Sequence, residues 1–192
     1  MAENDALRAQ VATMQEKAAL YDVLKNENDS LQQIVHLVDH VSGVTAPIVS
    51  SIYASPYGTF MIGAGTDDGV ATGSIVLSGD ADGFVIGRVA SAGKDHSLVV
   101  QTFAPGVSVD VVVDGASIAA AGKGGNAIAS APRGLSIAEG DPVRAPAYGN
   151  MVVGVVGAVH SDAASAAQTV YIALPVALGS STFVYVIPSS QS

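Results

Sequence analysis

The chain has 192 residues, of which 49% are hydrophobic and only 13% charged, and its formal net charge is −9. Such an apolar chain can bury a core, which argues against wholesale disorder. Its eight Lys and Arg residues are scattered singly, which excludes the basic stripe that nucleic-acid binding needs. The absence of cysteine excludes disulfides, thiolate chemistry and Cys-ligated zinc. No run of about 18 apolar residues occurs, so the sequence predicts no transmembrane helix.

A break in composition divides the chain in two. Residues 1–42 contain neither Gly nor Pro, whereas all 21 Gly and all 8 Pro lie in residues 43–192. The first part has apolar residues at helical spacing, and Ser42 with Gly43 provides a stop signal. We therefore predict a mostly β protein with an N-terminal coiled-coil helix over residues 1–43, followed by a β region over residues 44–192 that forms two small barrel-like lobes.

The helical part carries a heptad seam. A helix of about 40 residues is about 60 Å long, which exceeds the width of the remaining domain. An apolar stripe that stands clear of its own domain favours a partner helix, although packing against the chain's own β region is the alternative. A polar residue at a core position favours a parallel dimer in fixed register. The predicted dimerisation residues are Tyr21, Leu24, Asn28, Leu31, Val35 and Val38.

The residue pattern of the second part, residues 44–192, is typical of short β-strands. Segments rich in Val, Ile, Thr and Tyr recur every 8–12 residues, separated by Gly and Asp. About 150 residues in about twelve short strands suit two small barrels. Residues 119–131 alternate weakly and predict either a flexible hairpin or an irregular crossing between the lobes. The predicted strands are 48–54, 59–64, 73–78, 83–92, 97–102, 107–114, 116–121, 126–131, 151–160, 168–174 and 182–187, with a short one near 142–144.

Two ordered sets of glycines narrow the interpretation. Residues 59–89 read TFMIGAGTDDGVATGSIVLSGDADGFVIGRV, which contains a Gly-x-x-Asp-Gly-Val turn and ends in Gly-Arg-Val. Residues 137–143 read IAEGDPV and are followed by the strand VGVVGAV at 153–159. In this order and spacing, the segments resemble the MreC family, here as a divergent member that lacks the family's N-terminal membrane helix. The segment ending in Gly-Arg-Val is one residue longer than the family's usual spacing.

The motif residues indicate structural roles, because glycines in such patterns mark turns, bulges and close backbone approaches. Gly65 and Gly69 allow a turn around Asp67 and Asp68, whose carboxylates can bond local N–H groups. The matched positions are Gly65, Asp68, Gly69, Val70, Gly73, Gly87, Arg88, Val89, Gly140, Asp141, Gly154 and Gly157.

The resemblance implies a non-enzymatic scaffold of the bacterial cell-elongation complex, which builds peptidoglycan and controls cell shape. It implies a membrane-associated position on the periplasmic, extracytoplasmic side, with the anchor outside this sequence. The implied partners are a second copy of the chain, a peptidoglycan transpeptidase, and MreD with other membrane proteins of the complex. No cofactor and no nucleic acid is implied. Phe84, Tyr148 and Phe183 are candidates for exposed contact residues, and apolar strand edges are a second candidate surface.

Other chemistries have weaker support in the sequence. His36 and His40 stand four residues apart on the predicted helix, but the Glu of a zinc-protease motif is missing, and a solvated face explains both. His96 and His160 are lone residues at strand ends. Asp80 to Gly83 lacks the other ligands of a calcium loop. The Gly-rich stretch at 122–125 lacks the remaining residues of a P-loop, which favours an ordinary loop.

Two further classes of function stay open from the residues alone. One is a hydrolase or metal enzyme with a β-barrel core and a helical oligomerisation arm. Such an enzyme needs a cluster of polar side chains that the sequence does not place together. The other is an unrelated structural or fibre module with a coiled-coil stalk, since one fold can serve many functions.

Overall fold

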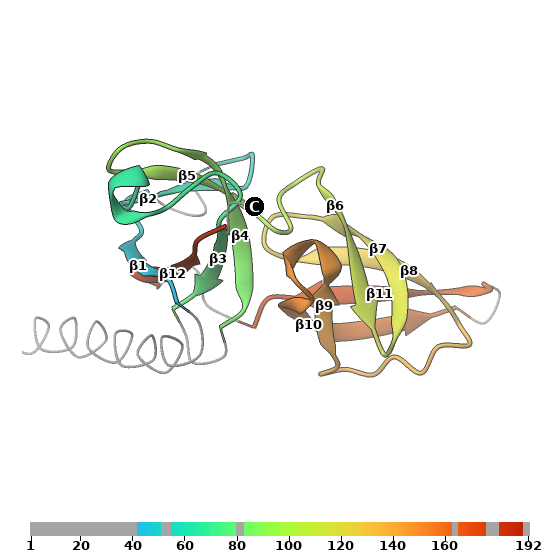
Figure 1. Ribbon diagram of the computed structural model, residues 1–192. Coiled ribbons are helices and arrows are strands. Elements are labelled where there is room, and N and C mark those ends of the chain that lie inside the picture. The colour runs from blue at the N-terminus through green and yellow to red at the C-terminus, as the bar shows by residue number, and fades with distance from the viewer. Residues whose placement is uncertain (1–41, 51–54, 80–82, 163–164, 176–180, 190–192) are drawn as a thin grey trace, which may run out of the picture.

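The computed structural model describes residues 42–50, 55–79, 83–162, 165–175 and 181–189, which form two lobes of antiparallel strands (Figure 1). One lobe is a six-stranded sheet in the order β1-β12-β3-β4-β5-β2, and the other is a closed barrel in the order β10-β11-β8-β7-β6-β9. The strands are β1 Val44–Pro47, β2 Thr59–Ile62, β3 Ile75–Ser78, β4 Val85–Ala92, β5 Ser97–Gln101, β6 Ser108–Val113, β7 Ala116–Gly122, β8 Ala127–Pro132, β9 Pro142–Ala145, β10 Met151–Ser161, β11 Ala167–Ala173 and β12 Phe183–Ile187; the short 3-10 helices are η1 Thr66–Asp68 and η2 Pro146–Tyr148.

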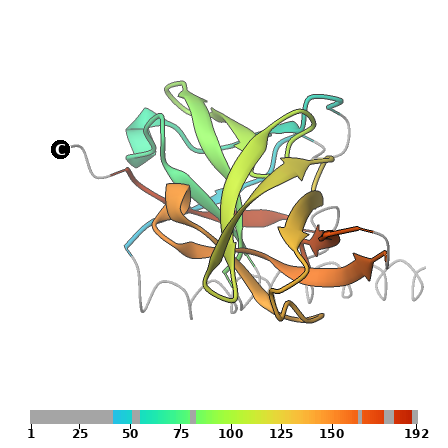
Figure 2. The ribbon, with the colours of Figure 1, turned by 90° about the vertical axis from the view of Figure 1, so that its right-hand side faces the viewer.

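The barrel lobe follows from alternation along its strands. In β11, Val170 and Ile172 are buried, whereas Tyr171 between them is 45% exposed. The strands β6 and β7 alternate in the same way, because successive side chains of a strand point to opposite faces. One set fills the barrel and the other faces outward, and Figure 2 looks onto this closed lobe. Closure leaves the barrel without edge strands.

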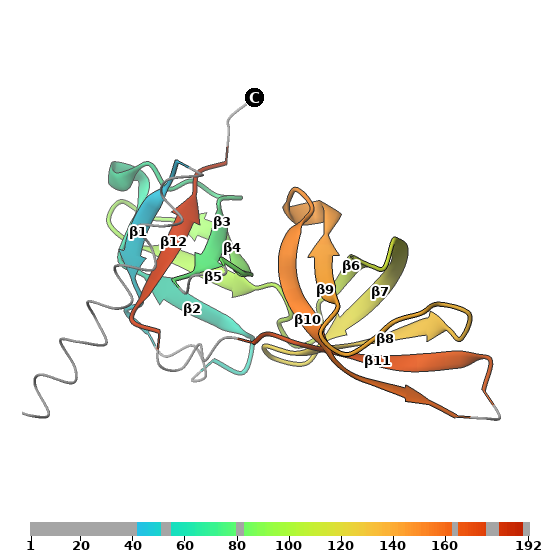
Figure 3. The ribbon, with the colours of Figure 1, turned by 90° about the horizontal axis from the view of Figure 1, so that it is seen from below.

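The sheet lobe is discontinuous in sequence. The chain builds β1 to β5, crosses to the barrel for β6 to β11, and returns as β12. The returning strand lies between β1 and β3, where Tyr185 pairs with Thr45 on one side and with Leu77 on the other. Figure 3 shows β12, in red, between the blue β1 and the green β3. The last strand of the chain therefore completes the first lobe.

Three strands of the sheet lobe are covered on both faces. On β12, Val184 and Val186 belong to the sheet lobe's own core, whereas Tyr185 belongs to the cluster that fills the barrel and the seam between the lobes. On β3, Val76 and Leu77 divide in the same way. The strands therefore have hydrophobic residues at consecutive positions, as expected where both faces of a sheet are buried. We call this contact between the lobes the interlobe seam. The cluster that fills the barrel and extends to Leu77, Val85 and Tyr185 of the sheet lobe is called the seam cluster.

The sheet lobe also draws its two edges together. Ile48, just after β1, bridges to Ile62 of β2. The amide of Gly63 donates to the carbonyl of Pro47 at 2.8 Å, and the amide of Val49 donates to the carbonyl of Met61 at 2.9 Å. The lobe is thus a half-barrel. The chain itself bridges these two edges in part, and the prediction that apolar strand edges serve as contact surfaces stays a prediction.

Comparison with the sequence confirms a mostly β protein with two barrel-like lobes, although only one of them is a closed barrel. The strand β1, Val44–Pro47, was not predicted; of the first predicted strand, 48–54, Ile48 makes an isolated bridge and residues 51–54 lie outside the described residues. Residues 119–131 form parts of the hairpin β7–β8 inside the barrel. The chain instead crosses between the lobes twice, between β5 and β6 and between β11 and β12. The predicted helix of residues 1–43 lies outside the described residues except for its last two positions, and stays a prediction.

Among the helices that the structure describes, none is long and apolar enough to cross a membrane.

The seam makes a testable prediction about stability. Leu77, 2% exposed, packs in the seam, so Leu77→Ala removes buried apolar contacts and leaves a cavity. We expect a loss of about 2–5 kcal/mol in the free energy of unfolding, measured by urea denaturation. Leu98→Ala is the matched control, because Leu98 is 37% exposed on β5 and should lose about 0.5 kcal/mol or less. Equal losses in the two variants would show that the seam is not a packed core.

Candidate functional site

The Gly-x-x-Asp-Gly-Val motif forms one compact turn around η1. The amide of Gly65 donates to Oδ2 of Asp68 at 2.9 Å, and the amide of Val70 donates to the carbonyl of Gly65 at 2.9 Å. Gly69 ends η1 with a φ of +83°, a conformation that favours glycine. Val70 then enters the core at 1% exposure. The motif therefore specifies a turn, with the Asp68 carboxylate used to satisfy a backbone donor.

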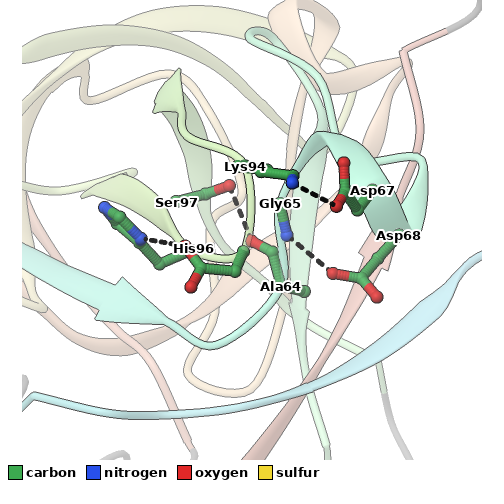
Figure 4. A network of polar contacts seen from close by, with 8 residues as sticks. Ala64, Gly65, Asp67, Asp68, Lys94, His96 and Ser97 are labelled. Carbon is green, nitrogen blue, oxygen red and sulfur yellow. Dashed lines mark hydrogen bonds and ion pairs between the residues drawn. The ribbon is translucent and has the colours of Figure 1, made fainter.

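This turn is fastened to the neighbouring hairpin between β4 and β5 (Figure 4). The amide of Thr66 donates to the carbonyl of Gly93 at 2.8 Å, and the amide of Asp67 donates to the carbonyl of Lys94 at 3.1 Å. A Cβ on Gly65 would lie 2.4 Å from the Lys94 carbonyl oxygen, so only glycine allows this approach. Beneath it, the Ser97 hydroxyl donates to the Ala64 carbonyl at 2.7 Å.

The charged side chains around this turn lie at the surface. The Lys94 ammonium stands 3.8 Å from an Asp67 carboxylate oxygen, and both side chains are exposed, so this ion pair is screened by solvent. Nδ1 of His96 lies 2.7 Å from Oδ1 of Asp95. That hydrogen bond holds the pKa of the exposed Asp95 carboxyl below its ordinary value. The arrangement places no buried acid or base here that could serve catalysis.

The second part of the first motif set positions β3 and β4. Gly73 has a φ of +93°, and its amide donates to the carbonyl of Val89 at 2.8 Å. A Cβ on Gly87 would lie 2.5 Å from the carbonyl oxygen of Val100, so this glycine permits close packing of β4 on β5. Val89 is buried in the sheet lobe's core. These motif residues are therefore structural parts of the sheet.

The extra residue in the Gly-Arg-Val segment forms a β-bulge. Val76 pairs with Gly87 and Leu77 pairs with Val85, which leaves Ile86 without a partner on β3. In a regular strand, Val85 and Arg88 would face opposite sides of the sheet. Because of the bulge, Val85 joins the seam cluster and Arg88 also reaches the barrel, while Ile86 stays in the core of the sheet lobe.

Arg88 is the motif residue that touches the other lobe. Its Nη2 donates to the carbonyl of Ala147 in η2, and its guanidinium carbon lies 4.7 Å from the ring centroid of Tyr148. The Nε of Arg88 is buried. Tyr148 is itself 9% exposed and belongs to the seam cluster. One cation of the sheet lobe is thus held against the face of an aromatic ring of the barrel lobe.

The second motif set organises the entrance to β9 and the strand β10. Gly140 has a φ of +89°, and Oδ2 of Asp141 accepts the amide of Ala138 at 2.7 Å. The amide of Gly140 also donates to the carbonyl of Val156 at 2.8 Å. Gly154 and Gly157 lie at the two register shifts of β10. They let β10 bend around the barrel, where a Cβ on Gly154 would meet the carbonyl oxygen of Ala173 at 2.8 Å.

Several predicted residues lie outside the part of the chain that the structure describes. The dimerisation residues Tyr21, Leu24, Asn28, Leu31, Val35 and Val38 lie outside the described residues, as do His36 and His40. Within the part of the chain that the structure describes, no three His, Asp or Glu side chains are placed to hold a metal ion. The Gly-rich stretch at 122–125 forms the turn of the hairpin β7–β8, as expected for a loop.

Two of the three predicted contact residues were wrong. Phe84 is 8% exposed and Tyr148 is 9% exposed, so both serve the interior, whereas Phe183 is half-buried and packs against the seam cluster. The large hydrophobic side chains that do reach the surface were missed by sequence reasoning. Alternation gave a usable signal for one of them, since Tyr171 stands between two inward residues of β11. Among the described residues, the exposed large hydrophobic ones are Val49, Tyr57, Leu98 and Tyr171.

A buried tyrosine strengthens the junction. Tyr185 is fully buried, and burial raises the pKa of its phenol above the ordinary value because the phenolate would lose solvation. Its ring edge is so close to Gly43 that a Cβ there would lie 2.8 Å away. Tyr185 therefore links the start of the described chain, β12 and the seam.

A comparison with protein families now identifies this two-lobed arrangement. Residues 48–188 match the family model described as "Rod shape-determining protein MreC, barrel core". This match spans well over half of the chain and covers both lobes. The chain belongs to the MreC family. No curated protein sequence matches this family member significantly.

Solved MreC structures share the fold. A structure described as MreC has a TM-score of 0.73 and 20% sequence identity, with 85% of this chain and 98% of that chain covered. MreC from Pseudomonas aeruginosa has a TM-score of 0.65 and 20% identity, covering 76% and 99%. The major periplasmic domain from the cell shape-determining filament MreC has a TM-score of 0.54 and 16% identity, covering 76% and 94%. The MreC fold is therefore retained at low sequence identity.

The η1 turn predicts a difference between two adjacent aspartates. Asp68→Ala leaves the Gly65 amide without its acceptor, so we expect a loss of about 1 kcal/mol in the free energy of unfolding. Asp67→Ala removes only an exposed ion pair and should cost about 0.5 kcal/mol or less. Chemical denaturation of both variants measures the difference. A larger loss for Asp67→Ala would contradict the structural role assigned to the Asp68 carboxylate.

The close approach at Gly87 predicts a steric effect. Gly87→Ala places a methyl group against the Val100 carbonyl and should destabilise the chain by about 1–3 kcal/mol. Gly134→Ala is the matched control, because nothing lies within 4 Å of its added Cβ and it should be neutral or stabilise by about 0.4–1 kcal/mol. Thermal and urea unfolding check both. Full stability of Gly87→Ala would show that β4 does not need this contact with β5.

Proposed function

We propose that the chain is a non-enzymatic, extracytoplasmic scaffold of the bacterial cell-elongation complex that carries out peptidoglycan synthesis. The observation that carries this proposal is the match of residues 48–188 to the MreC barrel core, across both lobes. A scaffold acts by holding partners together, which raises their effective concentration. Cell-shape control then follows from the placement of the synthetic enzymes.

The roles of the motif residues support this proposal. Asp68 and Asp141 accept backbone amides within their own turns. The motif glycines provide positive φ angles or close strand packing. Arg88 contacts the other lobe. The pattern that suggested the family is thus used to shape a two-lobed surface, as a binding scaffold requires.

The proposed location and partners extend the family assignment. One similar structure is described as a periplasmic domain of a cell shape-determining filament, which supports an extracytoplasmic position for this chain. We propose association with the membrane through an anchor outside this sequence. We also propose dimerisation through the heptad seam of residues 1–43, and binding to a peptidoglycan transpeptidase, MreD and other membrane proteins of the complex. Two linked copies bind a clustered partner with greater avidity than one copy.

Binding of the purified chain to the monofunctional elongation transpeptidase of its source organism tests the scaffold. We expect saturable binding that weakens at least about tenfold in the Leu24→Ser, Leu31→Ser and Val38→Ser triple variant, because loss of the dimer removes avidity. The matched control is His36→Ser with His40→Ser, which alters the predicted outer face of the same helix. Sedimentation velocity reports whether only the triple variant becomes monomeric.

Two results would contradict this function. Absence of binding by all forms at high micromolar concentration would favour an unrelated structural module. Hydrolytic turnover by the purified chain, or a metal retained on it and lost in the His36 and His40 variant, would favour the enzyme class. If the wild-type chain is monomeric and still binds the transpeptidase, the proposed dimer is wrong and the proposed scaffold function is supported.

A further inference from the structure

We propose that Arg88 is an interlobe latch, meaning that its contact with Ala147 and Tyr148 fixes the angle between the sheet lobe and the barrel lobe. The latch concerns the relation between the two lobes, so it does not depend on which partner the chain binds. It deepens the picture of the seam, where apolar packing holds the lobes together but does not by itself select one orientation.

The seam alone is weakly directional. Hydrophobic contact is roughly proportional to the apolar area removed from water and has no preferred direction. Leu77, Val85 and Tyr185 of the sheet lobe share one cluster with the barrel core, which opposes separation of the lobes. A small rotation of one lobe on the other would preserve much of this buried area. Relative motion is the ordinary expectation for joined lobes unless their interface restrains it.

The crossing between β5 and β6 is one of the two places where the chain passes between the lobes, the other lying between β11 and β12. Backbone hydrogen bonds join the residues after β5 to the hairpin β7–β8. The amide of Gly124 donates to the Phe103 carbonyl at 2.8 Å, and the amide of Gly122 donates to the Val107 carbonyl at 2.7 Å. Phe103 itself is buried in the seam cluster. The crossing is thus anchored to the barrel, and rotation of the sheet lobe about it needs a second restraint elsewhere.

Arg88 supplies that second restraint with directional contacts. A guanidinium is planar, and it can donate hydrogen bonds and stack on an aromatic face at the same time. Here Nη2 donates to the Ala147 carbonyl while the group lies over the Tyr148 ring. These two partners are adjacent in η2, so the group is fixed both along the loop and above it. The Nε of Arg88 is buried without a hydrogen-bond partner among the described residues, so the contact rests on Nη2 and on the ring of Tyr148.

The receiving loop is itself well supported. The amide of Gly149 donates to the Pro146 carbonyl at 3.1 Å, and the amide of Asn150 donates to the Ala145 carbonyl at 3.0 Å. Gly149 has a φ of +65°, which closes η2 sharply. The ring of Tyr148 is anchored in the core below. The loop at η2 is therefore held firmly on the barrel lobe, and a contact between Arg88 and η2 is a contact with that lobe.

The sequence builds the latch through one extra residue. The bulge at Ile86 turns Arg88 to the barrel side, which a regular strand from Val85 would not do. Within the described residues, Arg88 is the cation that contacts η2 from the sheet lobe. The bulge therefore has a specific consequence, because it changes a surface arginine into an interlobe contact.

Distance measurements between the lobes test the latch. The chain has no native cysteine, so spin labels can be placed on Thr72→Cys in the sheet lobe and Ser130→Cys in the barrel, both at exposed positions. Pulsed electron–electron double resonance spectroscopy then measures the distribution of distances between the two labels in the full chain. We expect a narrow distribution for the wild-type background and one at least about twofold broader in Arg88→Met, because the apolar seam alone permits rotation.

Matched variants separate the latch from general destabilisation. Arg133→Met removes an arginine whose Nη1 donates to Ser165 within the barrel lobe, and the distribution should stay narrow. Tyr148→Phe keeps the aromatic face and should also stay narrow. Tyr148→Leu should broaden the distribution as Arg88→Met does. The variant that combines Arg88→Met with Tyr148→Leu should have a distribution no broader than that of either single variant. Arg88→Lys keeps the charge without the planar group and provides the same test if Arg88→Met does not fold.

Circular dichroism confirms that each variant is folded before the distances are compared. A distribution in folded Arg88→Met that is as narrow as in the wild type would overturn the proposal, since apolar packing would then fix the angle alone. Equal broadening in Arg133→Met, or additive broadening in the double variant, would overturn it as well. Broadening confined to the Arg88 and Tyr148→Leu variants would establish the latch.

Discussion

The structure depends on the burial of both faces of β3, β4 and β12. Val76, Ile86 and Val186 face the core of the sheet lobe, while Leu77, Val85 and Tyr185 face the seam and the barrel. A sheet that exposes one face to water needs hydrophobic residues at alternate positions only, whereas these strands have them at consecutive positions. The two lobes therefore share an interior. Each lobe requires the other to cover apolar surface that it would otherwise expose.

The chain path makes this dependence stronger. The barrel is inserted between β5 and β12, so the sheet lobe is completed only after the barrel strands have been made. The contacts of Thr45 and Leu77 with Tyr185 join residues far apart in sequence. Such pairings pay the entropy of closing a long loop before they gain stabilisation. The returning strand thus ties the whole β region into one unit, with the seam at its centre.

The family motifs are explained by the demands of this backbone. Gly65 admits a neighbouring carbonyl, Gly87 admits β5, and Gly154 and Gly157 allow β10 to bend. Asp68 and Asp141 satisfy amides at turns where no strand partner is available. These residues therefore determine the shape of the two-lobed surface. Membership of the MreC family and the structural roles of its motif residues therefore agree.

The sequence alone predicted most strand positions, because period-two alternation and Gly-rich turns are local signals. It also placed the turn at Gly65–Val70 and the loop at 122–125, where residue type restricts the backbone directly. It missed β1, because the short Val44–Pro47 segment gives little alternation, and the pairing with Phe183–Val186 that makes it a strand is distant in sequence. The predicted coiled coil lies outside the described residues.

What the tertiary structure decided is which face each apolar residue covers. Phe84, Tyr148 and Phe183 are aromatic residues near turns, and composition gives no means of telling a surface contact from a seam contact. In the folded chain Phe84 and Tyr148 are buried and Phe183 is half-buried, with Tyr148 part of the cluster that the two lobes share. The contact of the charged Arg88 is likewise not visible in the local sequence. It depends on a bulge in β4 and on the η2 loop, 59 residues away. Local sequence fixes the period of a strand, but burial is a property of what packs against it.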